Sequence, residues 1–138
     1  MQPILLDTGV IVAWLNRRDR YHKRCVAALS GLRQPFVTPE AVIAESCYML
    51  QSIPAAIDRV LENVADGTFQ IPVPLSEYAS EAGSNLRKYR DTPADFADAC
   101  LIAMADKLDT GDILTLDSDF KNYRWRRNRS FNLLIPLD

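Results

Sequence analysis

The sequence lacks several features that would point to common kinds of catalysis or to an extracellular protein. It has one histidine, no Ser-His-Asp arrangement, and only five glycines in 138 residues. The three cysteines, Cys25, Cys47 and Cys100, are far apart and form no CxxC pair, which indicates reduced thiols in a cytosolic protein. No apolar run approaches the roughly 18 residues that span a bilayer. The N-terminus has no basic region before an apolar stretch, so no signal peptide is expected.

The composition is that of a globular chain with local basic patches. Apolar residues make up 48 % and charged residues 25 %, and 138 residues are enough for one domain with a proper core, predicted to span residues 1–138. The net charge of −2 does not indicate a nucleic-acid binder by itself. However, five basic residues lie between Arg17 and Arg24, and five more lie between Lys121 and Arg129. A mildly acidic protein can carry such patches for a polyanionic partner.

Short apolar segments alternate with longer helical segments along the chain. Strands are predicted at residues 3–6, 35–37, 69–75, 113–116 and 131–135, and helices at 10–15, 22–32, 39–51, 53–65, 76–90 and 92–108. This alternation predicts an α/β fold with a mainly parallel sheet of four or five strands. Pro72 and Pro74 restrict the third strand to an edge of the sheet.

The helix predicted at residues 92–108 is the most informative segment. Thr92 fits the N-cap, Pro93 fits the first helical position, and Asp95 completes a T-x-x-D capping box; Thr38-Pro39 shows the same start signal. The helix is almost wholly apolar and is therefore expected to be buried. Asp98 lies among these apolar residues, and a buried carboxylate is costly unless it is paired, hydrogen-bonded or bound to a metal.

Three further acids are expected near Asp98. Asp7 and Asp117 each follow an apolar strand, at the sheet edge where open parallel sheets bind ligands, and Glu45 lies early in another helix. Carboxylates brought together repel one another, and a hard cation such as Mg²⁺ or Mn²⁺ relieves that repulsion. One metal, or two about 4 Å apart, would activate a water for phosphodiester hydrolysis. No protein nucleophile is then needed.

Each acid also has a simpler interpretation. Asp7 and Asp117 are candidate N-caps of the helices that follow them, and Glu45 is a candidate for a solvated helix face. Asp95 caps its helix or binds metal directly. Asp119 competes with Asp117 for the role of fourth acid. Asp98 is the hardest to explain without a functional site.

Four motifs in order resemble a PIN-domain ribonuclease, close to the VapC-type toxins of bacterial toxin–antitoxin pairs. The matching segments are ILLDTGVIVAWLN, TPEAVIAES, DFADACLIAMA and ILTLDSDF, and together they cover essentially the whole chain. The resemblance implies a three-layer α/β/α sandwich, a cytoplasmic Mg²⁺- or Mn²⁺-dependent endoribonuclease, a homodimer, and a small cognate antitoxin as partner. A catalytically silent module that binds RNA or a protein partner is the alternative.

The resemblance also implies roles for individual residues. The catalytic quartet would be Asp7, Glu45, Asp98 and Asp117, with direct metal contact from Asp7 and Asp98. Supporting roles would fall to Thr8, Asp95 and Asp119. Gly9 stands where the family commonly has serine, which removes one hydrogen bond from the site.

The basic residues are candidates for contact with RNA or with an antitoxin. They are Arg17 and Arg18 after the first helix, and Arg124, Arg126 and Arg127 around Trp125. Arginines interleaved with an aromatic residue suit phosphate contacts and base stacking. A solvated surface is the alternative for each patch, and His22 is expected to be a surface residue.

Overall fold

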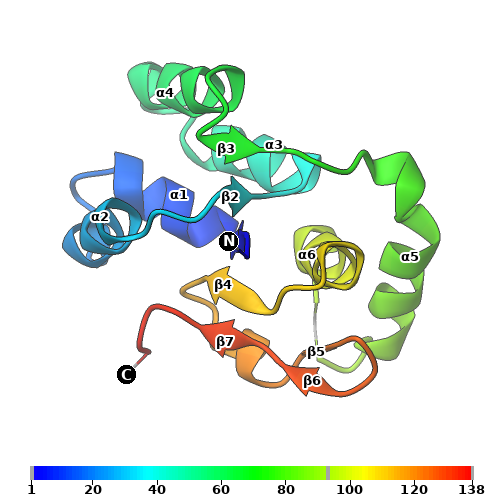
Figure 1. Ribbon diagram of the computed structural model, residues 1–138. Helices are drawn as coiled ribbons and strands as arrows, with labels where there is room; N and C mark the ends of the chain where they lie inside the picture. Colours follow the sequence, from blue (N-terminus) through cyan, green and yellow to red (C-terminus); the bar gives the residue numbers. More distant parts are fainter. Residues whose placement is uncertain (1, 93, 138) are drawn as a thin grey trace.

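A five-stranded parallel sheet forms the centre of the computed structural model, which describes residues 2–92 and 94–137 (Figure 1). In spatial order its strands are β3 (Phe69–Gln70), β2 (Phe36–Val37), β1 (Ile4–Leu6), β4 (Asp112–Leu114) and β7 (Asn132–Leu133). Every neighbouring pair is parallel, with Leu5 of β1 opposite Val37 on one side and Ile113 on the other. The predicted parallel sheet is confirmed, and β3 lies at an edge as expected.

Helices cover both faces of this sheet. They are α1 (Thr8–Leu15), α2 (His22–Gly31), α3 (Glu40–Met49), α4 (Pro54–Ala65), α5 (Ala79–Lys88) and α6 (Phe96–Leu108), with short 3₁₀ turns η1 (Leu75–Glu77) and η2 (Ser118–Lys121). Figure 1 shows α1 and α2 on one side of the sheet and α5 and α6 on the other. The predicted three-layer α/β/α arrangement is therefore confirmed. In the described part of the chain, no helix is long and apolar enough to cross a membrane.

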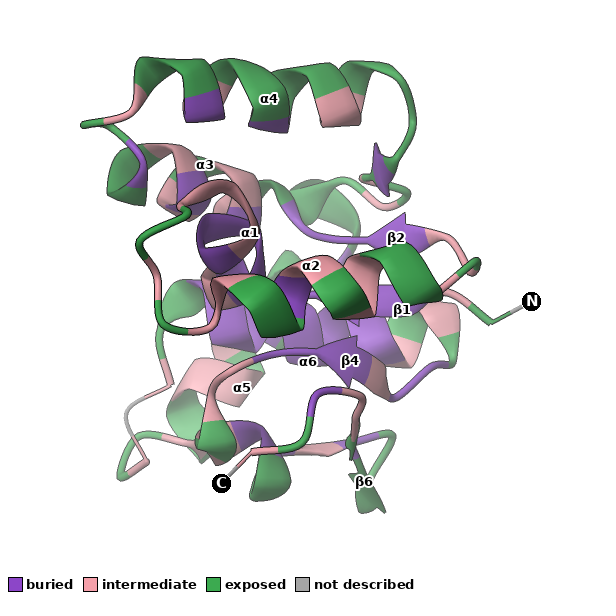
Figure 2. Cartoon of the chain, turned by 90° about the vertical axis from the view of Figure 1, so that its left-hand side faces the viewer, coloured by how far each residue is buried: buried purple, intermediate pink, exposed green. Residues whose placement is uncertain are grey.

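The core lies along β1, β4 and α6. All of β1 is buried, and so is every residue of α6 from Ala97 to Ala105 (Figure 2). A strand buried on both faces reads as a continuous apolar run, which is why Ile4–Leu6 could be predicted from the sequence. Asp98 is part of the buried stretch of α6, so the expected conflict between burial and charge is present.

The start of α6 differs from the prediction. The helix begins at Phe96, and its N-cap is Asp95, whose extended backbone (φ −83°, ψ 178°) precedes the first helical turn. The capping box therefore pairs Asp95 with Asp98, and the predicted box between Thr92 and Asp95 is wrong. Aspartate is as good an N-cap as threonine, so the sequence contained two start signals and the later one is used. The predicted place of Pro93 lies outside the described residues.

Other predicted elements were also longer than the observed ones. α3 has Pro39 as its N-cap without a side-chain cap bond, because the Thr38 hydroxyl donates instead to the carbonyl of Leu6 at 2.8 Å. The predicted strand 69–75 pairs only over Phe69–Gln70, since Pro72 and Pro74 have no N–H to donate. The predicted helix 76–90 is divided into η1 and α5.

A hairpin of two short strands was not predicted. It consists of β5 (Arg124–Trp125) and β6 (Arg129–Ser130), which pair antiparallel outside the main sheet. Residues 124–130 are called the arginine hairpin below. Arg126 and Arg127 form its turn with positive φ angles of 40° and 72°.

Candidate active site

The order of the strands places a switch point between β1 and β4. From β1 the chain continues to β2 and β3 on one side, while β4 and β7 lie on the other. Ligands in open α/β sheets bind in the crevice beyond the carboxyl ends of the strands at such a point. Asp7 directly follows β1, and its backbone N–H donates to the carbonyl of Leu114, the last residue of β4, at 3.0 Å.

A cleft of about 270 Å³ opens at this switch point, and we call it the carboxylate cleft. Its lining residues are Asp7, Thr8, Gly9, Glu45, Met49, Asp95, Asp98, Leu116 and Asp117. Five of these nine residues carry carboxylates, and they come from separate parts of the chain. The structure thus brings together the four predicted catalytic acids and Asp95. Asp119 is not among the lining residues.

Asp7 is held by short hydrogen bonds from both sides. It is only 6 % exposed, and its Oδ1 accepts from the backbone N–H of Thr8 at 2.8 Å as the N-cap of α1. Its Oδ2 accepts from the hydroxyl of Thr115 at 2.7 Å. Burial raises the pKa of Asp7 to about 6, and the nearby charges of Asp117 and Asp95 add to this effect. The N-cap interpretation is correct, and it is compatible with a place in the cleft.

Asp98 is more strongly perturbed than Asp7. It is 7 % exposed, its backbone N–H donates to Oδ1 of Asp95 at 2.9 Å, and its own Oδ2 accepts from the backbone N–H of Asp95 at 3.4 Å. Burial, together with the charges of Asp7, Asp95 and Asp117, raises the pKa of Asp98 to about 8. The charges of neighbouring carboxylates therefore raise these pKa values, as expected for a shared site.

Asp117 and Glu45 complete the acidic lining. Asp117 caps η2, with Oδ1 accepting from the backbone N–H of Asp119 at 2.9 Å, and burial raises its pKa. Glu45 is half-buried on α3 and faces the cleft, where the alternative interpretation had placed it on a solvated surface. Asp119 supports the turn through its backbone.

Two side chains that bind these acids were missed at the sequence level. Thr115 is fully buried; its hydroxyl donates to Asp7 and accepts from the backbone N–H of Asp117 at 3.0 Å, so it bridges the two acids. The hydroxyl of Tyr123 donates to Oδ2 of Asp98 at 3.3 Å. The signal for Thr115 was a polar residue within an apolar strand, whereas nothing in the sequence marked Tyr123.

The donors in the cleft suit a hard divalent cation. The carboxylates and the Thr8 hydroxyl offer oxygens, and among the described residues the buried Thr8 hydroxyl has no hydrogen-bond partner. Over residues 2–92 and 94–137, however, no three His, Cys, Asp or Glu side chains are yet arranged to hold an ion. At Gly9 a Cβ would lie 3.8 Å from Leu116, so a serine would fit there.

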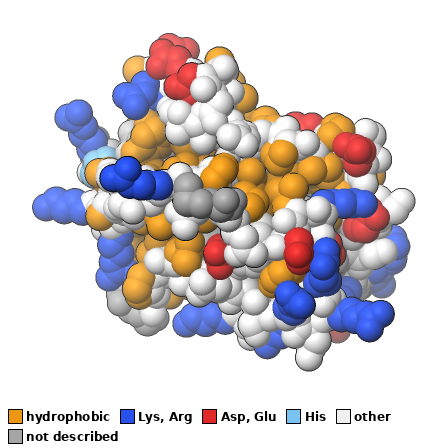
Figure 3. Space-filling model, viewed as in Figure 1, with side chains coloured by type: hydrophobic (Ala, Val, Ile, Leu, Met, Phe, Trp, Pro, Cys, Tyr) orange, Lys and Arg blue, Asp and Glu red, His pale blue; other side chains and the backbone are white. Residues whose placement is uncertain are grey.

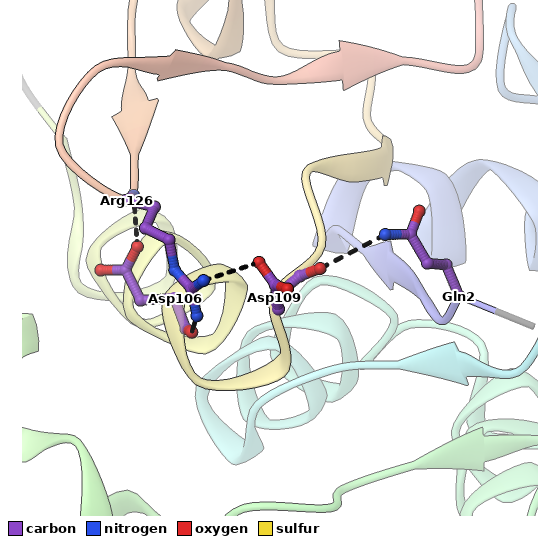
Figure 4. Close-up of polar contacts among 4 residues, drawn as sticks. All are labelled: Gln2, Asp106, Asp109 and Arg126. Carbon is purple, nitrogen blue, oxygen red and sulfur yellow. Dashed lines mark hydrogen bonds and ion pairs between the residues drawn. The ribbon is translucent and has the colours of Figure 1, made fainter.

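The predicted basic contacts differ in how far their charges are satisfied. Arg126 pairs with Asp109 at 3.0 Å and also bonds Asp106 (Figure 4). Arg124 donates to the carbonyls of Lys121 and Tyr123 at 2.9 Å. Trp125 is buried, so its predicted use as a base-stacking surface is wrong.

By contrast, three of the predicted contacts are exposed and unengaged. Among the residues described, the side chains of Arg17, Arg18 and Arg127 make no hydrogen bond or ion pair. Figure 3 shows Lys and Arg side chains gathered near the arginine hairpin and around α2.

The fold and the cleft together define a class: a small parallel α/β sandwich whose functional groups are clustered acids at the switch point of the sheet. Comparison with known proteins gives the family. The chain belongs to the PIN domain family, whose sequence model matches residues 4–126. The resemblance inferred from the four acidic motifs is thereby confirmed.

Individual relatives are similar over almost the whole chain. Ribonuclease VapC26 of Mycobacterium tuberculosis (strain ATCC 25618 / H37Rv) is 25 % identical over 137 residues, which cover 97 % of this chain and 93 % of that protein. The crystal structure of Mycobacterium tuberculosis VapC20, described as a sarcin-ricin loop cleaving toxin, superposes with a TM-score of 0.79 at 18 % identity. The match covers 86 % of this chain and 93 % of VapC20, and at this identity it shows the fold. The chain is thus a PIN domain protein that is similar to VapC26 over almost its whole length.

Proposed function

We propose that this protein is a Mg²⁺- or Mn²⁺-dependent endoribonuclease and the toxin of a toxin–antitoxin pair. The observation that carries the proposal is the carboxylate cleft, in which Asp7, Glu45, Asp98 and Asp117 converge at the switch point of a PIN fold. The similarity to ribonuclease VapC26 supports RNA as the substrate. Burial first, and neighbouring carboxylates second, raise the pKa values of Asp7 and Asp98, so a counter-charge in the cleft would favour their ionised forms.

We assign the residues of the cleft two roles, direct contact with the cation and support of the residues that make this contact. Asp7 and Asp98 are the proposed direct metal contacts because they are the most deeply buried acids and face each other's charge. Asp117 and Glu45 complete the acidic wall, while Asp95 keeps the first turn of α6 in place. The cation, when bound, supplies activation of water and stabilisation of charge on the phosphate. The free hydroxyl of Thr8 is available to a ligand or a water in the cleft.

Positive charge near the acidic cleft is needed to attract a polyanion. Arg17 and Arg18 follow the C-terminal end of α1, the end opposite to the turn that lines the cleft, and Arg127 is exposed at the tip of the arginine hairpin. We propose these three unengaged arginines as contacts for RNA phosphates or for an acidic antitoxin segment. Arg124 and Arg126 serve the hairpin's own structure first, since both already bond to the protein.

RNA cleavage tests the proposed activity. Wild type, Asp98→Asn and Asp58→Asn are compared on the same RNA with Mg²⁺ or Mn²⁺; Asp58 is an exposed acid on α4 and serves as the matched control. Asp98→Asn should lose more than about 100-fold in rate, beyond the loss typical of a group outside the direct ligand shell. Asp58→Asn should cleave like wild type. Equal cleavage by wild type and Asp98→Asn would mean a contaminating nuclease, and the catalytically silent module would then be favoured.

A homodimer and an antitoxin are the proposed partners. Large apolar side chains are exposed at Tyr48 (70 %), Met49 (54 %) and Phe96 (46 %), and their helices α3 and α6 contact each other. An apolar surface of this kind suits a second copy of the chain. Light scattering of wild type and Tyr48→Glu tests this: wild type should be a dimer and the variant a monomer. Co-expression with the product of the adjacent open reading frame tests for inhibition by an antitoxin in the cytoplasm.

A further inference from the structure

Asp98 receives a side-chain hydrogen bond from a part of the chain that no acidic motif includes. Tyr123, just after η2, is fully buried, and its hydroxyl donates to Oδ2 of Asp98 at 3.3 Å. The same oxygen accepts the backbone N–H of Asp95 at 3.4 Å. Within the described residues, no hydrogen bond reaches Oδ1 of Asp98. The two oxygens of this carboxylate are therefore not equivalent: one is held by the protein, and the other is available.

The ring of Tyr123 is fixed by an aromatic cluster. It packs edge-on against Tyr89, with centroids 4.9 Å apart, and against Phe120, with centroids 5.0 Å apart. Phe120 in turn packs against Phe131 at 5.3 Å. Packing of this kind allows the ring little freedom, so the hydroxyl is presented to Asp98 at a fixed point. Because η2 carries Asp117 at its start, one short segment positions two of the acids.

A merely structural aromatic residue would not need this hydroxyl. A phenylalanine would fill the same space and would avoid the cost of burying a polar group, which is about 1–3 kcal/mol when unpartnered. In the described part of the chain, the hydrogen bond of this hydroxyl goes to a carboxylate of the cleft. A group that donates a hydrogen bond to a metal ligand, on the side away from the metal, sets the orientation of that ligand. Loss of such a group typically lowers metal affinity or activity about 10- to 100-fold.

We propose that Tyr123 is a positioning residue of the carboxylate cleft: its hydroxyl holds Oδ2 of Asp98 so that Oδ1 remains directed to a divalent cation. The inference rests on the proposed function only for the presence of a cation site, and not for the identity of the RNA. Tyr123 touches neither the cation nor the substrate in this scheme, and it acts through Asp98.

The test compares Tyr123→Phe with Tyr89→Phe, because both remove one hydroxyl from the same aromatic cluster. Within the described residues, the Tyr89 hydroxyl accepts one hydrogen bond, from the backbone N–H of Arg124 at 2.9 Å, and it makes none with an acid of the cleft, so Tyr89→Phe serves as the control. The Mn²⁺ dissociation constant is measured by calorimetry and by the rise in melting temperature, without RNA. We expect it to increase about 10- to 100-fold in Tyr123→Phe and to stay within about twofold in Tyr89→Phe. Near-ultraviolet circular dichroism verifies that both variants keep their aromatic packing.

A double-mutant cycle tests whether Tyr123 acts through Asp98. In the Asp98→Asn background, Tyr123→Phe should cause little further loss of Mn²⁺ affinity, because the carboxylate it positions is gone. Additive losses, or wild-type Mn²⁺ affinity in Tyr123→Phe, would overturn the proposal, as would a wild type that does not bind Mn²⁺. If wild type binds Mn²⁺ but cuts no RNA, the nuclease function fails while the positioning role stands.

Discussion

The carboxylate cleft and the arginine hairpin are both clusters of like charge, yet the protein treats them in opposite ways. In the cleft, Asp7 and Asp98 are buried beside other acids, and they are held by hydroxyl and backbone donors. In the hairpin, Arg126 is paired with Asp109, the C-cap of α6, and also bonds Asp106 within that helix (Figure 4). The cleft leaves its charge uncompensated, while the hairpin neutralises part of its own.

This difference separates a binding site from a structural feature. Uncompensated buried charge is costly and persists where a ligand supplies the counter-charge, so it indicates function. Charge that is already paired within the chain contributes to local structure and has less to offer a partner. The uncharged Trp125 of the same hairpin is likewise engaged within the chain: its indole N–H donates to the carbonyl of Ser130 at 3.1 Å, and its ring packs so closely over Gly111 that any Cβ there would overlap it.

The largest effect is expected where the uncompensated charge is removed. The folded pKa of Asp98 is about 8, against about 3.9 for an unfolded aspartate, so the folded state holds this proton more tightly. Below about pH 4 the carboxyl costs no stability, and its cost grows as the pH rises toward about 8. In EDTA at a pH near 8, the unfolding free energy of Asp98→Asn should be higher than that of wild type by roughly 2–4 kcal/mol. Urea denaturation over a pH series measures this difference.

Two comparisons make that result specific. Asp58→Asn, which removes an exposed carboxylate on α4, should follow the wild-type pH dependence. Adding Mn²⁺ at alkaline pH should raise the melting temperature of wild type more than that of Asp98→Asn, because the variant cleft binds the ion more weakly. If Asp98→Asn lost stability with pH as steeply as wild type does, the charge of this residue would not be the cost that we infer.

The acids could be predicted from the sequence because each follows a pattern of its own. Asp7 and Asp117 end apolar strands, and Asp98 interrupts an apolar helix, so each is conspicuous to a reader of one sequence. Thr115 and Tyr123 are not conspicuous, because their roles depend on contacts across 108 and 25 residues of chain. The start of α6 was misplaced because Thr92 and Asp95 are both good caps, and only tertiary packing decides between them.

A smaller effect is expected when an uncharged side chain that hydrogen-bonds the acids is changed. Thr115→Val keeps the shape of the side chain but deletes the hydroxyl that bridges Asp7 and Asp117. We expect a loss of about 1–3 kcal/mol in stability and about 10- to 100-fold in Mn²⁺ affinity. Thr115→Ser, which keeps the hydroxyl, should retain most of the Mn²⁺ affinity. Calorimetric titration of the three proteins measures it, and equal Mn²⁺ affinity in Thr115→Val and wild type would limit Thr115 to a packing role.

The smallest effect is expected for the arginines, and it tests whether arginines paired within the chain contribute less to RNA binding than unengaged ones. Arg126→Met breaks an ion pair whose side chains are 48 % and 59 % exposed, so it should cost at most about 1 kcal/mol. It should leave the salt dependence of RNA binding unchanged. The double variant Arg17→Met/Arg18→Met removes two unengaged cations; it should leave stability unchanged and make the logarithmic salt slope for single-stranded RNA shallower by about 1.4. Binding is measured in the Asp98→Asn background, which prevents cleavage. If the salt slope became shallower in Arg126→Met and stayed unchanged in the double variant, pairing within the chain would not predict which arginines contact RNA.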